Sequence, residues 1–134
     1  MPQLISQLKK EHKSIEEKLN AVKAIGIGRK AGRELFLAIG NELLTHMSKE
    51  DEVLFPALKG KRGPDGISEK IISTYIEDMS KASAIAHDFF KKHSSLDSEI
   101  DFVKDYGKLS VALKSRMKRE EEIFFPQYLD MQGN

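Results

Sequence analysis

One segment of this sequence occurs twice, seventy residues apart. The stretch HMSKEDEVLFP runs from His46 to Pro56, and RMKREEEIFFP runs from Arg116 to Pro126. Met, two Glu, Phe and Pro return in register, whereas His46 is replaced by Arg116 in the second copy. The repeat predicts two equivalent structural segments. It also raises the question of what a His-x-x-x-Glu unit does here, and what an arginine does in its place.

Apolar residues recur at three- and four-residue steps in four stretches of the chain, which is the period of an amphipathic helix. Each predicted inward face also carries at least one ionisable residue, and strand-like alternation is absent. The faces are Leu4, Leu8, Ile15, Leu19 and Val22 around His12; Leu35, Ile39, Leu43 and Leu54 around His46 and Glu50; Ile72, Ile76, Met79, Ser83 and Phe90 around His87; and Tyr106, Leu109, Leu113 and Phe124 around Arg116 and Glu120.

Glycine-rich and polar segments separate these four stretches. GIGRKAG, residues 26–32, ends the first helix, and KGKRGPDG, residues 59–66, is the clearest loop. Asp65 or Ser68 then supplies the N-cap of the third helix, and the polar residues 94–97 predict the last break.

Four helices of roughly 20 to 30 residues joined by short loops predict an all-α, up-down-up-down antiparallel four-helix bundle. Pro56 and Pro126 are expected near the ends of their helices, where a kink or a stop costs least. The length suits one core, so residues 1–134 are interpreted as a single domain.

Charge and composition exclude several classes of function. The 22 basic and 21 acidic side chains give a net charge of +1, which argues against nucleic-acid binding and against attraction to an anionic membrane. The sequence has neither a long apolar run nor a basic, apolar leader, so we expect a cytoplasmic protein. Because the chain has no Cys, any metal must bind to His and carboxylates.

The ionisable residues on the inward faces are the candidate metal ligands. Residues four apart on a helix point in nearly the same direction, so each repeated Glu shares its direction with the His or Arg that opens its segment. Burying unpaired carboxylates would cost several kcal/mol each, whereas imidazole and carboxylate together suit iron, manganese or zinc. The predicted metal ligands are His12, His46, Glu50, His87 and Glu120.

Two neighbours of these residues are interpreted differently. His93 lies six residues beyond His87 and is rotated by roughly 120° from it, so we expect a surface or boundary histidine. The acidic residues that follow the two repeated Glu, such as Asp51, are expected on a solvated face. Glu121 stays an alternative to Glu120, since a helix irregularity could turn it inward.

These motifs resemble the hemerythrin-like, or HHE cation-binding, family over nearly the whole chain. The resemblance rests on His12, on LLTHMSKEDEVLFP (residues 43–56), on AHD around His87 and on EEEIFFP (residues 120–126). It implies a four-helix bundle around a non-haem, usually di-iron, centre in proteins that bind or sense O2, respond to NO, repair iron centres or sense iron. All five candidate ligands match expected family positions, with the two glutamates as candidate bridges.

The chain also departs from the family pattern. Oxygen-carrying hemerythrins use five histidines, including a His-x-x-x-His on the third helix, where this chain has His87 followed by Lys91. Four histidines occur in the whole sequence, so a complete oxygen-carrier site is excluded by count. Related sequences with His-x-x-x-Glu on the fourth helix have His where Arg116 stands, so a further ligand is lost.

Arg116 has three possible roles, because a guanidinium donates hydrogen bonds but offers no lone pair to a metal. It could pair with Glu120 or Glu50 and supply the charge of a second cation, so that the site holds one metal or none. It could lie at the open edge of a two-metal site. It could also extend to solvent. The survival of five candidate ligands slightly favours the two-metal site.

The leading functional hypothesis is a non-haem iron protein for O2 or NO sensing or for iron handling, not for bulk oxygen transport. Two irons are expected, with one metal or another divalent metal as alternatives. A second hypothesis is a metal-poor regulatory or interaction bundle, in which Arg116 replaces a ligand and pairs with core carboxylates. An enzyme such as an oxidase or peroxidase ranks third, because no nucleophile is paired with a base outside the metal ligands.

Overall fold

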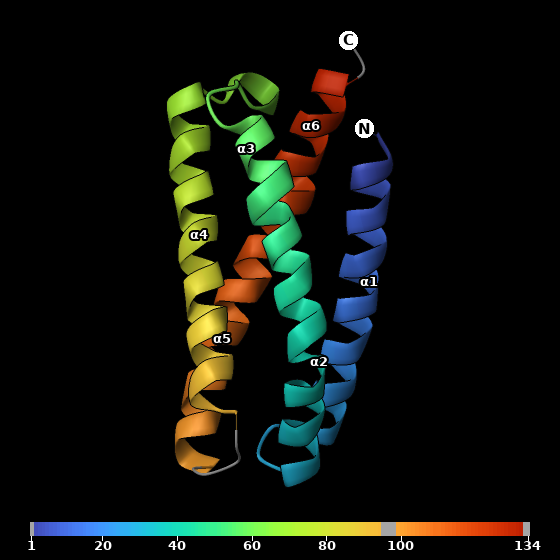
Figure 1. Ribbon diagram of the computed structural model, residues 1–134, viewed down its shortest axis with the longest axis vertical. Coiled ribbons are helices and arrows are strands. Elements are labelled where there is room, and N and C mark those ends of the chain that lie inside the picture. Colours follow the sequence, from blue (N-terminus) through green and yellow to red (C-terminus); the bar gives the residue numbers. More distant parts are fainter. Residues whose placement is uncertain (1, 95–98, 133–134) are drawn as a thin grey trace.

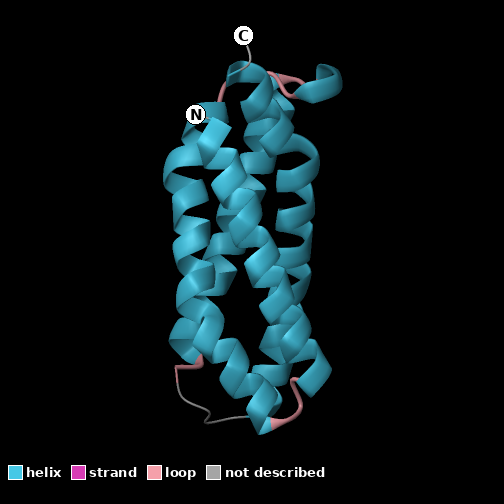
Figure 2. Ribbon diagram, turned by 90° about the vertical axis from the view of Figure 1, so that its right-hand side faces the viewer, coloured by secondary structure: helices cyan, strands magenta, loops and turns pink. Residues whose placement is uncertain are grey.

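The computed structural model describes residues 2–94 and 99–132, and these form an antiparallel bundle of four long helical arms (Figure 1). The first and third arms are single helices, whereas the second and fourth are each interrupted by a π-helical turn. In chain order the elements are α1 (Pro2–Ile25), α2 (Lys30–Lys49), η1 (Glu50–Leu54), α3 (Phe55–Leu58), η2 (Pro64–Gly66), α4 (Glu69–Lys92), α5 (Glu99–Arg119), η3 (Glu120–Phe124) and α6 (Phe125–Gln132). The described residues contain helices and loops but no strand (Figure 2), so the predicted all-α up-down-up-down fold is confirmed.

The turns follow the glycine and capping signals of the sequence. Gly26 ends α1 with φ +100°, a conformation that side chains disfavour. A Cβ on Gly32 would collide with the Gly26 carbonyl, so the next helix can begin close to the turn. Ser68 caps α4 by accepting a hydrogen bond from the Ile71 amide, as predicted. The predicted break at residues 94–97 falls mostly outside the described residues.

The two copies of the repeat form the two π-helical turns, η1 and η3. In each, the amide before the proline reaches five residues back: Phe55 donates to the Glu50 carbonyl, and Phe125 donates to the Glu120 carbonyl. A proline has no amide hydrogen and its ring crowds the carbonyl four residues earlier, so a wider turn accommodates it inside a continuing helix. Pro56 lies near the end of its helical arm at Leu58, as predicted, whereas the helix continues beyond Pro126 to Gln132.

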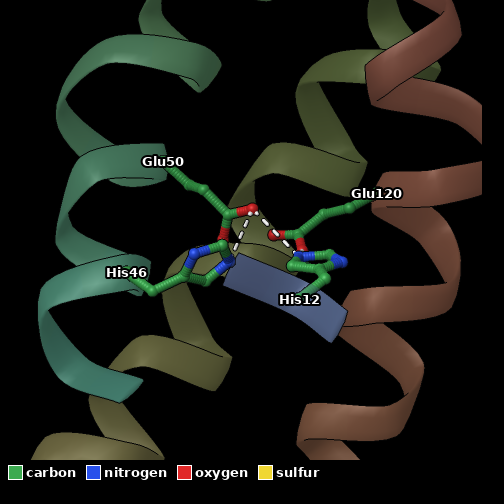
Figure 3. Close-up of side chains that lie close together, drawn as sticks. All are labelled: His12, His46, Glu50 and Glu120. Carbon is green, nitrogen blue, oxygen red and sulfur yellow. Dashed lines mark ion pairs between the residues drawn. The ribbon is translucent and has the colours of Figure 1, made fainter. Parts of the chain in front are cut away.

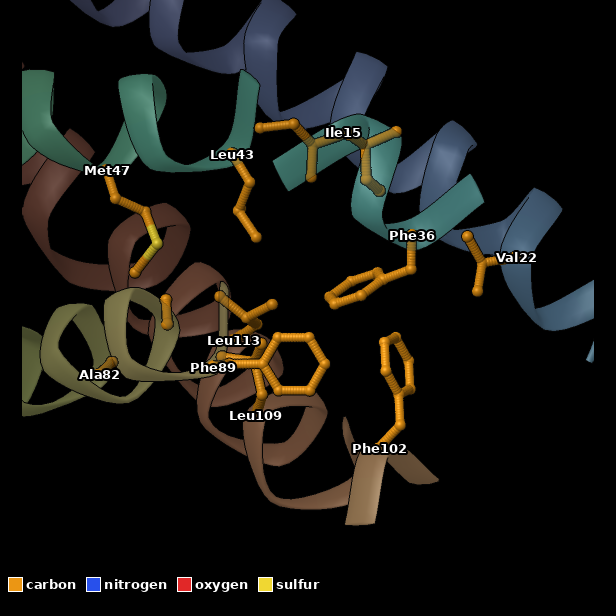
Figure 4. Packing of buried hydrophobic residues seen from close by; sticks show 12 residues of the cluster. Ile15, Val22, Phe36, Leu43, Met47, Ala82, Phe89, Phe102, Leu109 and Leu113 are labelled. Carbon is orange, nitrogen blue, oxygen red and sulfur yellow. The ribbon is translucent and has the colours of Figure 1, made fainter. Parts of the chain in front are cut away.

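The core consists of two apolar clusters separated by a layer of polar side chains. The lower cluster, which is drawn in Figure 4, contains Ile15, Val22, Phe36, Ile39, Leu43, Met47, Ala82, Ala86, Phe89, Phe102, Leu109 and Leu113. The upper cluster contains Ile5, Leu8, Leu54, Phe55, Leu58, Ile72, Met79, Phe124, Phe125 and Tyr128. Between them lies what we call the polar layer, which consists of His12, His46, Glu50, Ser83, Arg116 and Glu120, all buried.

We expect the buried side chains of the lower cluster to contribute strongly to the stability of the protein. Phe102 is 1% exposed and packs its ring against Phe89, so Phe102→Ala should lower the free energy of unfolding by about 3–5 kcal/mol. Val111 is 69% exposed on the same helix, and Val111→Ala should change that free energy by less than about 0.5 kcal/mol. Urea unfolding followed by circular dichroism measures both. Equal losses in the two variants would contradict the assigned core.

Candidate metal centre

Four ionisable side chains from three of the helical arms meet in the polar layer. His12 comes from the middle of α1, His46 from the end of α2, and Glu50 and Glu120 open the two π-helical turns. Figure 3 shows the four side chains directed toward one another. All are at most 5% exposed, and we call them the four-ligand cluster.

Three short distances define the geometry of this cluster. His12 Nε2 lies 2.9 Å from Glu120 Oε1 and 3.4 Å from Glu50 Oε2, and His46 Nε2 lies 3.2 Å from Glu50 Oε2. None of these four atoms has a hydrogen-bond partner of acceptable geometry among the described residues. Buried polar atoms normally have such partners, so four unsatisfied atoms converging on one point indicate a place for a cation.

The donor set and its dimensions fit one metal ion. Each residue offers one ligand atom, and the four atoms lie within 4.8 Å of one another. Bonds from imidazole or carboxylate to a divalent metal are about 2.0–2.2 Å long, so ligands of one ion lie no more than about 4.4 Å apart. A small contraction would therefore bring all four atoms into one coordination sphere. Two imidazoles and two carboxylates suit iron, manganese or zinc.

Both histidines are oriented by a carboxylate on their outer nitrogen. His46 Nδ1 lies 2.7 Å from Glu11 Oε1, and the other oxygen of Glu11 accepts a 2.7 Å bond from Lys49. His12 Nδ1 lies 3.3 Å from Glu121 Oε1. A carboxylate at Nδ1 favours the tautomer that carries hydrogen there and leaves the Nε2 lone pair free. In that tautomer both Nε2 lone pairs would face the centre of the cluster, as metal ligands require.

Arg116 occupies the opposite side of the two glutamates. It is 2% exposed, and its Nε donates to Glu120 Oε2 at 3.0 Å while its Nη2 donates to Glu50 Oε1 at 3.1 Å. Each glutamate therefore has one oxygen on the guanidinium and one oxygen facing the histidines. This is the ion pairing considered from the sequence, extended to both carboxylates at once. An extension of Arg116 into solvent is excluded by its burial.

Four further contacts fix the position of the guanidinium. Arg116 Nη1 donates to the Ser83 hydroxyl at 2.6 Å and to the Met79 carbonyl at 2.8 Å. Nη2 also donates to Asp51 Oδ1 at 3.1 Å and to the Met47 carbonyl at 3.3 Å. The Ser83 hydroxyl donates to Asp51 Oδ2 at 2.6 Å, which closes a small ring of hydrogen bonds. The guanidinium is held by groups from α2, η1, η3 and α4.

Attraction between the histidines and the glutamates sets the protonation of the cluster when no metal is bound. Burial alone would lower the pKa of His12, but contacts with Glu120 and Glu50 outweigh this effect and raise the pKa to about 10. Burial alone would raise the pKa of Glu50, but its contacts with His12 and His46 outweigh this effect and lower the pKa. Burial and the charge of Glu50 raise the pKa of Glu120 to about 7. The metal-free cluster therefore holds protons at neutral pH, and a metal would have to displace them.

The structure brings together four of the five predicted ligands, and His87 is not among them. His87 is exposed on α4. The residues of that helix that face the core are Ile72, Met79, Ala82, Ser83, Ala86 and Phe89, and a helical turn of 100° per residue places His87 about 90° from the middle of this face. The expectation of an inward His87 was therefore wrong, and Ser83 is the residue through which α4 enters the polar layer.

The expectation for His93 was also wrong. This histidine is 4% exposed, its Nε2 lies 2.7 Å from Asp105 Oδ2, and its ring packs between Phe89 and Phe102. It packs against the lower cluster and is not part of the four-ligand cluster. Its partner Asp105 belongs to another helix, so the periodicity of α4 alone gave no signal for it.

The choice between Glu120 and Glu121 is resolved by the π-helical turn. Glu120 is fully buried and points inward, whereas the Glu121 side chain is 49% exposed and reaches only the outer nitrogen of His12. Sequence reasoning missed the roles of Glu11 and Asp51, because both act across helices on residues that no fixed spacing links to them.

Aromatic rings border the cluster and the guanidinium. The Phe125 ring lies 5.2 Å from the His12 ring, and the Phe55 ring lies 5.2 Å from the central carbon of the Arg116 guanidinium. These rings belong to the upper cluster and help to exclude water from the charged atoms, which strengthens their electrostatic interactions. Among the described residues, no helix has the length and apolar character needed to cross a membrane.

The comparison with family models agrees with this geometry. Residues 3–128 match the hemerythrin HHE cation-binding domain. Searches among curated proteins and among solved structures return no significant match. The match spans almost the whole chain, and the four-ligand cluster provides a buried place for a cation inside the bundle. The chain therefore belongs to the hemerythrin HHE cation-binding domain family.

Proposed function

We propose that this protein binds one non-haem iron ion with His12, His46, Glu50 and Glu120, and that it serves O2 or NO sensing or iron handling. The observation that carries the proposal is the convergence of four buried ligand atoms that lack hydrogen-bond partners among the described residues. Iron is chosen because the ligand types suit it and because it is the usual metal of the family that the sequence resembles.

One ion is proposed in place of the two that the sequence favoured. A second ion between the glutamates would need the oxygens that Arg116 already binds, Glu50 Oε1 and Glu120 Oε2. Together with Asp51, these glutamates provide three negative charges, which the guanidinium and one divalent cation would balance. A second divalent cation would leave uncompensated positive charge in a buried layer, at a cost of several kcal/mol.

Ligand number supports the binding of a small molecule. Four protein ligands leave open positions on an ion that accepts five or six, and a redox-active metal at such a position can bind O2 or NO. The chain contributes the surroundings: the outer carboxylates hold the histidines in place, and the aromatic rings limit the access of water. Arg116 binds one oxygen of each glutamate and so fixes the positions of both carboxylates.

One observation favours a second candidate function. Arg116 forms ion pairs with both core glutamates, as expected for a metal-poor regulatory or interaction bundle. Against that function, the four atoms on the histidine side of the cluster approach one another at 2.9–3.4 Å but form no hydrogen bond of acceptable geometry within the described residues. A bundle that needs no metal would stay equally stable after chelation.

Loss of a ligand should remove metal-dependent stability. Iron(II) added without air should raise the melting temperature of the wild-type protein, because a ligand that binds only the folded state stabilises it. His46→Gln should weaken metal binding at least about tenfold, since loss of an outer partner alone costs about 10–100-fold. His87→Gln is the matched control, because His87 is exposed and outside the cluster. Equal losses in both variants would show that the metal binds elsewhere.

A change at Arg116 should alter the number of metal ions. In Arg116→His an imidazole replaces the guanidinium and frees one oxygen of each glutamate, so bound iron should rise from about one ion per chain toward two. Arg116→Gln frees the same oxygens without adding a ligand, so it separates loss of charge from gain of a ligand. Elemental analysis after anaerobic loading measures the ratio. Two ions per chain in the wild-type protein would contradict the single-ion proposal.

Binding of a small molecule should be visible in the spectrum. Iron(II)-loaded protein exposed to NO should develop new visible absorption, because NO reaches an open position on the ion. Zinc-loaded protein is the control, since zinc has no redox chemistry and should stay silent. A fully iron-loaded sample that shows no change with either NO or O2 would argue against the sensing role and leave iron handling.

A further inference from the structure

A cleft of about 330 Å³ lies between α1 and α5, beside the lower cluster. It exists because α1 packs mainly against α2 and α6, whereas α5 packs against α4. Val22, Phe36 and Leu113 form its floor and are all buried; Figure 4 shows the packing around them. Leu19 from α1 and Met117 from α5 form its half-buried walls. The cleft therefore offers an apolar surface that no helix covers in the described part of the chain.

The charged residues at this cleft are both cationic. Lys23 lies on α1 and Lys114 on α5, so one lysine stands on each side, and no acidic residue lines the cleft in the described part of the chain. Both lysines are exposed, and neither forms an ion pair with a described residue. Uncommitted ammonium groups over an apolar floor are complementary to a molecule that has an apolar body and one negative end.

Acidic residues line a neighbouring cavity, which makes that cavity less suitable than the cleft for the negative end of a ligand. An adjoining cavity of about 350 Å³ shares Leu19, Asn20, Lys114 and Met117 with the cleft, and its other lining residues are Lys118, Glu16, Glu121 and Glu122. Three carboxylates outnumber two lysines there, so an anionic group is favoured less than in the cleft, where both charged residues are lysines. The negative end of a ligand would therefore stay at the lysines, and its apolar body would lie over the floor of the cleft.

We propose that the cleft between α1 and α5 binds a small aliphatic carboxylate, with its chain on Val22, Phe36 and Leu113 and its carboxylate between Lys23 and Lys114. The volume lies within the usual range of small-molecule sites, about 300–1,000 Å³. This site is separate from the four-ligand cluster, and it goes beyond metal binding because it needs no metal.

The first test uses octanoate as the probe and octylamine as a probe of equal length and opposite charge. Both are titrated into isotopically labelled, zinc-loaded protein while amide resonances are recorded. Octanoate should shift the amides of the cleft residues on α1 and α5 and bind at least about tenfold more tightly than octylamine, because two ion pairs replace two repulsions. Equal binding of both probes, no binding, or shifts at His12 and His46 instead would overturn the proposal.

Two kinds of variant complete the test. Leu19→Trp should fill the cleft and abolish octanoate binding, whereas Lys23→Glu with Lys114→Glu should leave the fold intact and reverse the preference in favour of octylamine. Zinc content should stay at the wild-type value in each variant, so a failure of the metal centre is recognised separately. If the protein instead dimerises through this face, with resonances that depend on protein concentration and not on octanoate, the carboxylate site is refuted.

Discussion

The arrangement of the polar layer depends on one buried guanidinium. Arg116 binds one oxygen of Glu50 and one oxygen of Glu120, and this leaves the other oxygen of each free to face the histidines. Ser83, Asp51 and two backbone carbonyls hold the guanidinium in this position. An unpaired buried arginine would cost several kcal/mol. The two carboxylates therefore compensate the buried charge of Arg116, and Arg116 in turn fixes the geometry of the site.

The repeat and the site have a common physical origin. Each copy places a proline six residues after its inward glutamate, and the wider turn that accommodates the proline begins at that glutamate. The π-helical turns thus allow the helices to continue past the polar layer into the upper cluster. Where the first copy has His46 as a candidate ligand, the second has a residue that cannot bind a metal. Because of this difference, one oxygen of each glutamate faces a guanidinium and the other faces the histidines.

Much of the fold and part of the site could be predicted from the sequence. Apolar periodicity identified the helical arms, and the spacing of four residues paired His46 with Glu50. The same reasoning failed for His87, because its helix presents a face centred between Ala86 and Met79 to the core, and for His93, whose partner lies on another helix. The roles of Asp51 and Glu11 depend on how the helices are placed against one another, which no local pattern encodes.

The central claim is that one ion and one guanidinium share the two glutamates, and anomalous diffraction from crystals of the iron-loaded protein tests it most directly. We expect a single iron peak within bonding distance of His12 Nε2, His46 Nε2, Glu50 Oε2 and Glu120 Oε1. Arg116 should still bind the remaining carboxylate oxygens. Two iron peaks with a displaced Arg116, or no peak in the polar layer, would contradict the claim.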